Sequence, residues 1–398
     1  MKLICRHWLI GRRWLPIAAL VTATAALAAC SSSNTSSTAP AGASASSSSG
    51  SVPAGVAKAQ QMVTQYESLT TQYQIPSKSL SGVSGFAGRT VYFIPFDANI
   101  PAFAIDAAGM KAAAAKAGLK FAECNGQDTP TVMAACVGQA VGQNAAGIVL
   151  DAIPYGMVQN ALDGAKGKGI PIVIADQYPP SGTTSNNQVA YVPSVVDQPS
   201  QVAWWLIAAS KGTANVLIGE QGDVPSSVAY VQNSLPIYKK YCPGCTVKVG
   251  QITTTMTTTQ VQSTVSTQLL SDPSARYYYL EFEASLQPTL GSIRQSGKSS
   301  GIDLAVAGGT VNGLGLLKSG GGVNAVVVVD DPYEGWALVD ETLRMMTKTG
   351  PVTETIPSRL FTAGNIGSIQ VTTADQASGV WFGDNSYQSQ FATLWGVG

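Results

Sequence analysis

The sequence predicts an α/β fold of two Rossmann-like lobes with parallel sheets, and three observations support this prediction. From Thr90 onward, short apolar runs alternate with helical stretches of about a dozen residues or more. The runs are continuously apolar, which is typical of strands that helices cover on both faces and that βαβ crossovers connect. A polar break at 181–188 falls near the middle of these runs, so two similar lobes are favoured over one sheet.

The elements follow from these runs in order. A first helix is expected at Val56–Tyr73, across the surface of the main fold, and Pro76 breaks it. The predicted strands are Val91–Pro95, Leu119–Glu123, Gly147–Asp151, Pro171–Asp176, Ala190–Val192, Asn215–Gly219, Val247–Ile252, Tyr277–Glu281, Asp303–Ala307 and Ala325–Asp330. The predicted helices between them are Ala102–Ala117, Pro130–Gln143, Pro154–Lys168, Gln198–Lys211, Ser226–Tyr241, Thr257–Leu270, Ser285–Ser296 and Pro332–Met346.

The first thirty residues have the pattern of an export signal. Four basic residues and no acidic one precede the apolar stretch Trp14–Leu27, which is short for a membrane span. The run Leu27–Cys30 resembles the lipobox of bacterial lipoproteins, which implies cleavage before Cys30 and a lipid on its sulfur; a plain secretory signal is the alternative. The Ser/Ala-rich segment that follows is typical of a flexible tether. We therefore expect an extracytoplasmic protein that meets the membrane only through the lipid at Cys30.

Composition argues against several classes of protein. The only histidine, His7, lies in the segment to be removed, so the mature chain lacks the commonest general base and metal ligand. The run Gly297–Gly301 matches a G-x-S-x-G pattern, but a Ser-His-Asp triad cannot be completed without histidine. Removal of 1–29 takes away four basic residues and no acid, which leaves 19 basic and 23 acidic residues. This net charge of −4 gives no electrostatic footprint for nucleic acid, and we expect no catalytic residue, metal or cofactor.

Four cysteines remain besides Cys30 and the one in the signal. An even count in an oxidising compartment suggests two disulfides, and proximity in sequence pairs Cys124 with Cys136 and Cys242 with Cys245. The second pair forms a C-x-x-C, for which a redox role is the alternative. A structural clip is favoured because the pair follows a predicted helix, whereas a reactive thiol pair needs a helix N-terminus.

Ligands of open parallel sheets bind beyond the carboxyl ends of the strands, and between two facing lobes this place becomes a cleft. Carboxylates and amides hydrogen-bond hydroxyl groups, and aromatic rings cover the apolar faces of a ligand. Asp97, Asp151 and Asp330 stand near helix starts, so helix capping is an equal alternative for them. The candidates that follow strands are Phe96, Asp97, Asn99, Asp151, Asp176, Gln177, Tyr178, Gln221, Asp223, Glu281, Phe282, Glu283, Thr310 and Asp330, and Glu220, Gly308, Gly309 and Asp331 also follow strands.

In this order of features the chain resembles the type I periplasmic binding proteins, in the ribose- and galactose-binding branch that serves ABC sugar importers, over roughly 85–395. Phe96–Phe103 occupies the place of that family's first-strand loop, where an Asn and aromatic residues meet the sugar, and this adds Phe103 to the candidates. Gly169–Asp176 is similar to the family's "NIPVITLD", whose Asp binds sugar hydroxyls. Asp330–Gly335 resembles the second hinge crossing, where the family often has a ligand-binding Gln in place of Asp330.

The second lobe departs from that family. The sugar-clamping Arg falls near Tyr230, which becomes a candidate in its place, the Asn-Asp pair becomes Phe282-Glu283, and the "GFD" turn becomes Gly308–Thr310. An acid-rich site without the Arg suits a polyol, an amino-bearing solute or a partly aromatic ligand as well as a sugar. The resemblance therefore implies a small sugar or sugar-like solute, an ABC permease in the membrane as partner, and a monomer.

The resemblance also implies hinge closure. The chain is expected to cross between lobes near Val192–Ser194, Asp330–Pro332 and Phe361–Gly364, with first-lobe residues holding the ligand and second-lobe residues completing the site on closing. The expected organisation is a signal at 1–29, the lipidated Cys and tether at 30–55, an N-terminal helix and lead-in at 56–84, lobe 1 at 85–192 plus 331–362, and lobe 2 at 193–330 plus 363–398.

Two other functional classes remain as alternatives. A sensor would present the bound solute to a membrane receptor with the same fold, and neighbouring genes for a permease and ATPase, or for a receptor, would separate these readings. An extracytoplasmic hydrolase would use paired carboxylates as acid and base on a glycoside, which requires two acids at a defined separation.

Overall fold

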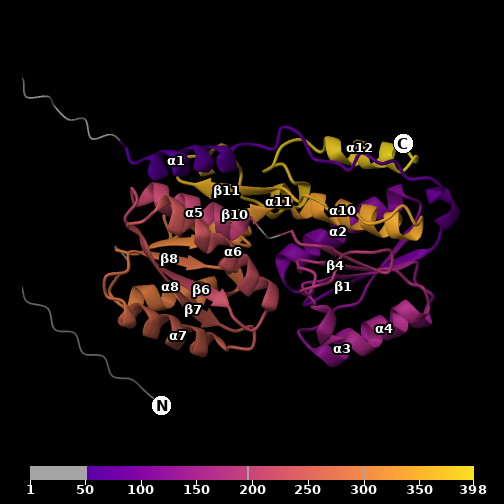
Figure 1. The fold of residues 1–398 in the computed structure, drawn as a ribbon, viewed down its shortest axis with the longest axis horizontal. Helices are drawn as coiled ribbons and strands as arrows, with labels where there is room; N and C mark the ends of the chain where they lie inside the picture. The colour runs from indigo at the N-terminus through magenta and orange to yellow at the C-terminus, as the bar shows by residue number, and fades with distance from the viewer. Residues whose placement is uncertain (1–51, 195–196, 299–300) are drawn as a thin grey trace, which may run out of the picture. The chain divides into compact units, whose positions relative to one another are not determined.

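Two sheets of mostly parallel strands organise the chain. The structure is a computed structural model that describes residues 52–194, 197–298 and 301–398. The expected signal, the lipidation at Cys30 and most of the tether lie outside these residues. Residues 52–398 belong to one compact unit, in which Figure 1 shows the first lobe in indigo to magenta and the second in pink to orange.

The first sheet has the order β2-β1-β3-β4-β5 and is parallel throughout. Alternate residues of its strands point to opposite faces, and both faces are buried. Helices α2 and α10 cover one face and α3 and α4 the other. The elements are β1 Thr90–Pro95, α2 Pro101–Lys116, β2 Lys120–Glu123, α3 Pro130–Gly142, β3 Gly147–Asp151, α4 Gln159–Gly167, β4 Ile172–Ala175, β5 Val189–Val192 and α10 Asp331–Met346, with short 3-10 turns at Val83–Phe86 and Tyr155–Met157.

The second sheet has the order β11-β10-β9-β8-β6-β7, with β11 antiparallel to β10 and the other pairs parallel. Helices α7, α8 and α9 cover one face, and α5 and α6 cover the other together with α1. The elements are α5 Gln198–Ala209, β6 Asn215–Gln221, α6 Pro225–Tyr241, β7 Thr246–Ile252, α7 Thr258–Ser271, β8 Tyr277–Leu280, α8 Leu286–Gln295, β9 Asp303–Val306, α9 Val311–Ser319, β10 Ala325–Val329 and β11 Ser358–Thr362, with 3-10 turns at Glu283–Ser285 and Ile366–Ser368.

Several expected boundaries near the C-terminus are wrong. Strand β11 was assigned to lobe 1, but it pairs with β10 in the second sheet, so Phe361–Gly364 is no lobe crossing; the chain crosses back earlier, between α10 and β11. Helix α12 (Ser386–Leu394) was assigned to lobe 2, but its aromatic residues join the core of lobe 1. Strand β11, α9, α11 (Thr373–Ser378) and α12 were not predicted. Their apolar residues are too sparse in sequence to stand out as runs, and partners far away in the chain select their structure.

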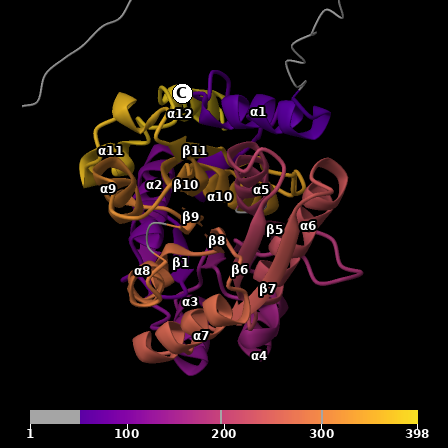
Figure 2. The same cartoon turned by 90° about the vertical axis from the view of Figure 1, so that its left-hand side faces the viewer.

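The N-terminal helix α1 (Ala54–Glu67) packs against α5 and β11 of lobe 2, as Figures 1 and 2 both show. It ends before the expected Tyr73, and Tyr73 instead enters the core of lobe 1, where its ring stacks on Tyr333 at 5.0 Å. The segment after α1 therefore also passes from one lobe to the other. None of the helices in the described ranges is long and apolar enough to cross a membrane.

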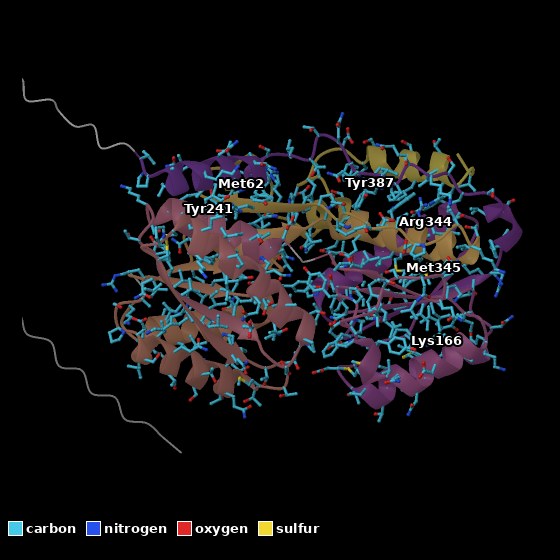
Figure 3. All side chains as sticks on the ribbon, viewed as in Figure 1. Met62, Lys166, Tyr241, Arg344, Met345 and Tyr387 are labelled. Carbon is cyan, nitrogen blue, oxygen red and sulfur yellow. A yellow bond between two sulfur atoms is a disulfide. The ribbon has the colours of Figure 1, made fainter. Side chains whose placement is uncertain are left out.

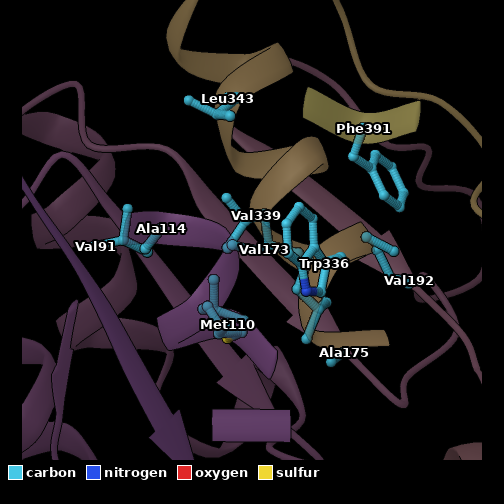
Figure 4. Packing of buried hydrophobic residues seen from close by; sticks show 14 of the residues in the cluster. Val91, Met110, Ala114, Val173, Ala175, Val192, Trp336, Val339, Leu343 and Phe391 are labelled. Atoms are coloured by element: carbon cyan, nitrogen blue, oxygen red, sulfur yellow. The ribbon is translucent and has the colours of Figure 1, made fainter. Parts of the chain in front are cut away.

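Helices α2 and α10 touch backbone to backbone in the core of lobe 1. A Cβ added at Gly335 would lie 2.5 Å from the backbone nitrogen of Met110, and one added at Gly109 would lie 2.8 Å from the carbonyl oxygen of Pro332. Only glycine allows so close a crossing. Around it, Trp336 of α10 reaches between the strand residues and Phe391 of α12 (Figure 4).

A buried ion pair joins α10 to the C-terminal helix. Arg344, labelled in Figure 3, lies on α10 and its Nε donates to Asp340 at 2.5 Å, with both side chains fully buried. The indole Nε1 of Trp395 donates to the other oxygen of Asp340 at 2.6 Å. This contact explains why the end of the chain belongs to lobe 1, since a lone buried charge is costly unless such partners surround it.

Both expected disulfides are present. Cys124–Cys136 links the end of β2 to α3 in lobe 1, and Cys242–Cys245 closes the turn between α6 and β7 in lobe 2. The C-x-x-C pair stands at the C-terminal end of α6, where no helix N-terminus stabilises a thiolate, and this agrees with a structural clip.

Candidate functional site

A cavity of about 180 Å³ lies between the two lobes. One water molecule needs roughly 10–15 Å³ by this measure, so the space suits a small molecule and not isolated waters. Its walls combine carboxylates, amides and aromatic rings from both sheets and from the start of α10. The lining residues are Phe96, Ile100, Ala102, Phe103, Asp106, Ala152, Asp176, Gln177, Gln198, Gln221, Val224, Ser227, Tyr230, Thr254, Phe282, Glu283, Ala284, Gly308, Gly309, Val329, Asp331 and Glu334.

Strand ends of the first sheet position one wall. Ala152 directly follows β3 and Asp176 directly follows β4, and both have a left-handed backbone, with φ of 55° and 57°. Residues other than glycine adopt this conformation at a cost and commonly do so at functional sites. The turn at Asp176 directs its carboxylate to the hydroxyl of Ser194, which donates to it. The backbone strain thus coincides with two residues of the cavity wall.

An acidic group forms the first-lobe side of the cavity, here called the acidic cluster: Asp106, Asp331 and Glu334. Asp331 and Glu334 are three residues apart on the first turns of α10, and Asp106 lies on α2 beside the glycine crossing. One carboxylate oxygen from each lies within 4.8 Å of the others, and all three side chains are buried. No metal was expected from the sequence, yet this spacing is one in which a cation can bind.

Burial and mutual repulsion raise the pKa values of these carboxyls. Burial is the largest cause for each member of the cluster, and the neighbouring carboxylates add to it, so their pKa values stand well above the usual range. Asp151, buried just behind the wall, has a raised pKa for the same reasons. Burial also raises the pKa of Asp176 to about 6, against a hydrogen bond from Ser194 that lowers it. All of these shifts favour the protonated, neutral form of the carboxyls.

Several oxygens of this region lack hydrogen-bond donors. Within the described part of the chain, Oδ1 of Asp106, Oε1 of Glu334 and both oxygens of Asp151 have no partner. The carboxyls of Asp106 and Asp151 are neighbours, and a hydrogen bond between them would form only with a proton on one of them. Buried polar atoms usually have partners, so Asp106 and Glu334, which line the cavity, are groups that a ligand could satisfy.

The second-lobe wall differs because its acid, Glu283, already has donors. Glu283 accepts hydrogen bonds from the backbone nitrogen of Thr310 at 2.7 Å and from its hydroxyl at 2.6 Å. Glu281, which lies off the wall, accepts from the backbone nitrogen of Gln221 at 2.7 Å with one oxygen, and its other oxygen has no partner in the described ranges. Burial raises the pKa of Glu281 to about 8. Gln198 lies at the start of α5, and its side chain accepts from the backbone nitrogen of Gly308 at 2.5 Å.

Direct contacts join the lobes at one flank of the cavity. The hydroxyl of Tyr230 on α6 donates to the carbonyl oxygen of Asp176 at 2.7 Å. The hydroxyl of Ser226 donates to the side-chain oxygen of Gln177 at 2.9 Å and accepts from the backbone nitrogen of Tyr178 at 3.1 Å. The rings of Tyr178 and Tyr230 lie 4.8 Å apart. The structure therefore shows a state in which the lobes already meet.

Half of the expected ligand-binding residues line the cavity, and they come from both lobes. These are Phe96, Phe103, Asp176, Gln177, Gln221, Tyr230, Phe282 and Glu283. Of the other expected residues, which lie off the wall that the described chain forms, Asp97 accepts from Asn99, Asp223 accepts from Thr254, and Glu281 accepts from Gln221.

The remaining three expected residues off the wall are Tyr178, Thr310 and Asp330, besides the buried Asp151. Tyr178 belongs to the lobe contact, and Thr310 caps α9. Asp330 caps α10, where it accepts from the backbone nitrogen of Tyr333, and it also accepts from the hydroxyl of Tyr73. Burial raises the pKa of Asp330 to about 7. For Asp330 the capping alternative describes the observed contacts.

Sequence reasoning missed Asp106, Glu334, Gln198, Ser227 and Thr254 as site residues. The rule that ligands bind at strand ends does not reach Asp106 and Glu334, because both lie inside helices. One signal was available: Asp106 is the lone acid in the otherwise mostly apolar helix Pro101–Lys116, one turn before a glycine. A buried acid on an apolar face is rare without a partner or a function.

The fold and the cleft define a two-lobed solute-binding protein of the type I periplasmic binding class. The chain belongs to the periplasmic binding protein family, because residues 91–349 match the family described as "Periplasmic binding protein domain". The expected fold class and the family resemblance are thereby confirmed. No match was found among curated protein sequences.

Solved structures share the fold at low sequence identity. The 5-methylthioribose transporter solute-binding protein from Thermotoga lettingae is 16% identical, with 76% of this chain and 98% of that chain covered and a TM-score of 0.63. A glucose-galactose binding protein from Geobacillus stearothermophilus is 16% identical, covering 69% and 97%, with a TM-score of 0.61. The Caulobacter myo-inositol binding protein is 17% identical, covering 71% and 95%, with a TM-score of 0.59.

Proposed function

We propose that this protein is the extracytoplasmic solute-binding lipoprotein of an ABC importer and that it captures a sugar or sugar-like molecule between its lobes. The observation that carries the proposal is a cavity of about 180 Å³ whose polar and aromatic walls come from both lobes of a periplasmic binding fold. Carboxylates and amides fix hydroxyl groups in direction, and rings such as Phe96 and Phe282 cover C–H faces. The similar structures include proteins that bind 5-methylthioribose and myo-inositol, which supports a polyhydroxylated ligand.

Hinge closure is the proposed mechanism of capture. The chain passes between the lobes between β5 and α5, at Asp330 and between α10 and β11, and few residues at such crossings need to change conformation. The ligand stabilises the closed form through contacts that it makes only there. The lipid on Cys30 would keep the protein beside a permease that recognises the closed lobes. We propose binding and transport, not catalysis, because the family consists of binding proteins.

A thermal-shift screen of sugars and polyols against residues 52–398 tests this proposal, because a ligand that binds only the folded state raises the melting temperature. For a compound that binds, Asp176→Ala should weaken binding by about 1–3 kcal/mol, the range for an unpaired buried partner. Calorimetry measures this change, and Asp375→Ala, a partly exposed acid in α11 away from the cavity, is the control. Unchanged affinity in Asp176→Ala would contradict its assignment to the site.

A further inference from the structure

The charge of the cleft distinguishes between classes of sugar-like ligand. Asp106 and Glu334 are 3% and 2% exposed, they line the cavity, and each has one oxygen without a donor in the described part of the chain. A buried carboxylate without a partner is costly, so these oxygens favour a ligand that donates to them. The feature differs from an ordinary exposed acidic patch because both side chains are buried.

Basic side chains do not balance these acids. Of the described residues that line the cavity, none is Lys, Arg or His, whereas Asp106, Asp176, Glu283, Asp331 and Glu334 are acids. The ion pairs found in the described ranges involve other carboxylates. The balancing positive charge is therefore absent from the wall of the cleft, and a ligand could supply it.

The spacing of the acidic cluster fits one ammonium group. Three acceptors that each lie about 2.9 Å from a tetrahedral nitrogen stand about 4.7 Å apart. One oxygen from each of Asp106, Asp331 and Glu334 lies within 4.8 Å of the others. A protonated primary amine has three N–H donors and no acceptor, which matches three carboxylates, whereas a hydroxyl has one donor.

We propose that the solute carries a protonated amine beside its hydroxyl groups, as in an amino sugar or aminocyclitol, with the ammonium held by Asp106, Asp331 and Glu334. This inference rests on the proposed function and names its substrate class. The rest of the cavity favours an organic cation over a metal ion. Phe96, Phe103, Tyr230 and Phe282 line it, and aromatic faces attract ammonium groups and cover carbon skeletons. A hydrated divalent cation would leave that apolar surface against water.

The raised pKa values of the cluster are consistent with this ligand. Without a cation, burial and mutual repulsion keep part of the group protonated. An ammonium favours the ionised carboxylates, so its binding should release protons to the solvent. Asp176 lines the same cavity and Asp151 lies behind its wall, and both are coupled to the cluster in its titration.

Calorimetry on the purified full chain with matched pairs tests the inference: glucosamine against glucose, galactosamine against galactose, and an aminocyclitol against myo-inositol, with N-acetylglucosamine as a neutral amide. We expect at least one amine to bind tenfold or more tightly than its hydroxyl counterpart, with proton release seen as a dependence of the heat on the buffer. Asp106→Asn and Glu334→Gln should each weaken amine binding tenfold or more and affect the counterpart less. Asp163→Asn, an exposed acid on α4 paired with Lys166, should change neither.

The outcomes separate the inference from the proposed function. If a neutral compound binds as tightly as its amine, the inference is wrong and the sugar-binding function stands. If no compound of either kind binds, the proposed function fails together with the inference. If calcium, magnesium or manganese alone raises the melting temperature of the wild type and not of Asp106→Asn or Glu334→Gln, the cluster is a metal site and the inference is overturned. The melting temperature of each variant without ligand shows whether it is folded.

Discussion

The two walls of the cleft differ in the number of their acids and in how these acids are hydrogen-bonded, with four acids on the first-lobe wall and Glu283 on the second. On the second-lobe wall, Glu283 accepts from the backbone and hydroxyl of Thr310, so both of its oxygens have donors. On the first-lobe wall, Asp106 and Glu334 each keep an oxygen that no donor in the described ranges reaches. A carboxylate whose oxygens both have donors stabilises its own lobe, whereas one with an oxygen that lacks a donor can accept from a ligand.

This comparison shows that residue type at a strand end is a weak guide to ligand contact. Glu283 lines the cavity, yet both of its oxygens already hold the turn before α9. Asp106 comes from the middle of a helix, and the glycine crossing of α2 and α10 brings it to the cavity. The donors that surround an acid therefore decide its role more than its place in the sequence does.

The largest loss of stability should come from a substitution at the crossing of α2 and α10, which carries the acidic wall. In Gly335→Ala the added Cβ meets the backbone of α2 at 2.5 Å, so the helices must separate. We expect a loss of about 3 kcal/mol or more in the free energy of unfolding, at the upper end of overpacking effects, together with loss of ligand binding. Chemical denaturation measures it. The control is Gly138→Ala on the exposed face of α3, where an added Cβ meets nothing within 4 Å, and it should be neutral or slightly stabilising. Equal losses of stability in both variants would contradict the close backbone contact at Gly335.

The pH dependence of stability should reflect buried carboxyls on and near the first-lobe wall. The folded pKa of Asp176 is raised to about 6 and that of Asp330 to about 7, above the unfolded values near 4. The folded protein therefore binds more protons, and the stability that these groups contribute below pH 4 is lost as pH rises through 6 and 7. A shift of about two units in one carboxyl corresponds to on the order of 2–3 kcal/mol. Denaturation of the ligand-free protein between about pH 5 and 8 checks the sign; a stability that increases with pH over this window would refute it.

Removing a carboxylate that has donors and removing one that lacks them should change the free energy of unfolding in opposite directions. Glu283→Ala removes the acceptor of a buried backbone donor and should cost about 2 kcal/mol. Asp106→Asn removes one of several repelling carboxylates and adds an amide donor beside Asp151, so it should stabilise the ligand-free protein by about 1 kcal/mol at pH 8. Urea titrations of both variants provide the comparison. Destabilisation of equal size in both would show that the first-lobe acids are structural.

The smallest effect should come from the contact that joins the walls. Tyr230→Phe removes the hydrogen bond to the carbonyl oxygen of Asp176 and keeps the ring beside Tyr178. The loss of about 1 kcal/mol from the closed form should weaken ligand affinity by about fivefold, measured by calorimetry. Tyr277→Phe, at the start of β8, is the matched control and should bind normally. An unchanged affinity in Tyr230→Phe would show that this bond does not favour closure.

Much of the fold could be predicted because its signal is local. Continuous apolar runs gave all the parallel strands, from β1 to β10, and the two disulfides followed from cysteine count and proximity. Strand β11 was not predicted because Arg359 interrupts its short apolar stretch with a charge. Its partner β10 is also distant in sequence, so no local pattern indicates the pairing. Helix α12 was expected in lobe 2, but Trp395 at its end donates to Asp340, which is paired with Arg344 in the core of lobe 1. No pattern in the sequence indicates this buried contact.

The sequence by itself determined the class of fold, the strand ends that face the cleft and the aromatic and amide residues Phe96, Gln221 and Phe282 on its walls. These follow from periodicity and from the rule that parallel strands end at one edge. Only the tertiary structure decided which acids are satisfied and which remain for a ligand. That depends on donors brought from distant segments, such as the backbone of Thr310 for Glu283, and on the close helix crossing that places Asp106 beside Glu334. Hydrogen-bond satisfaction is a property of three-dimensional neighbours, and neighbours in sequence do not reveal it.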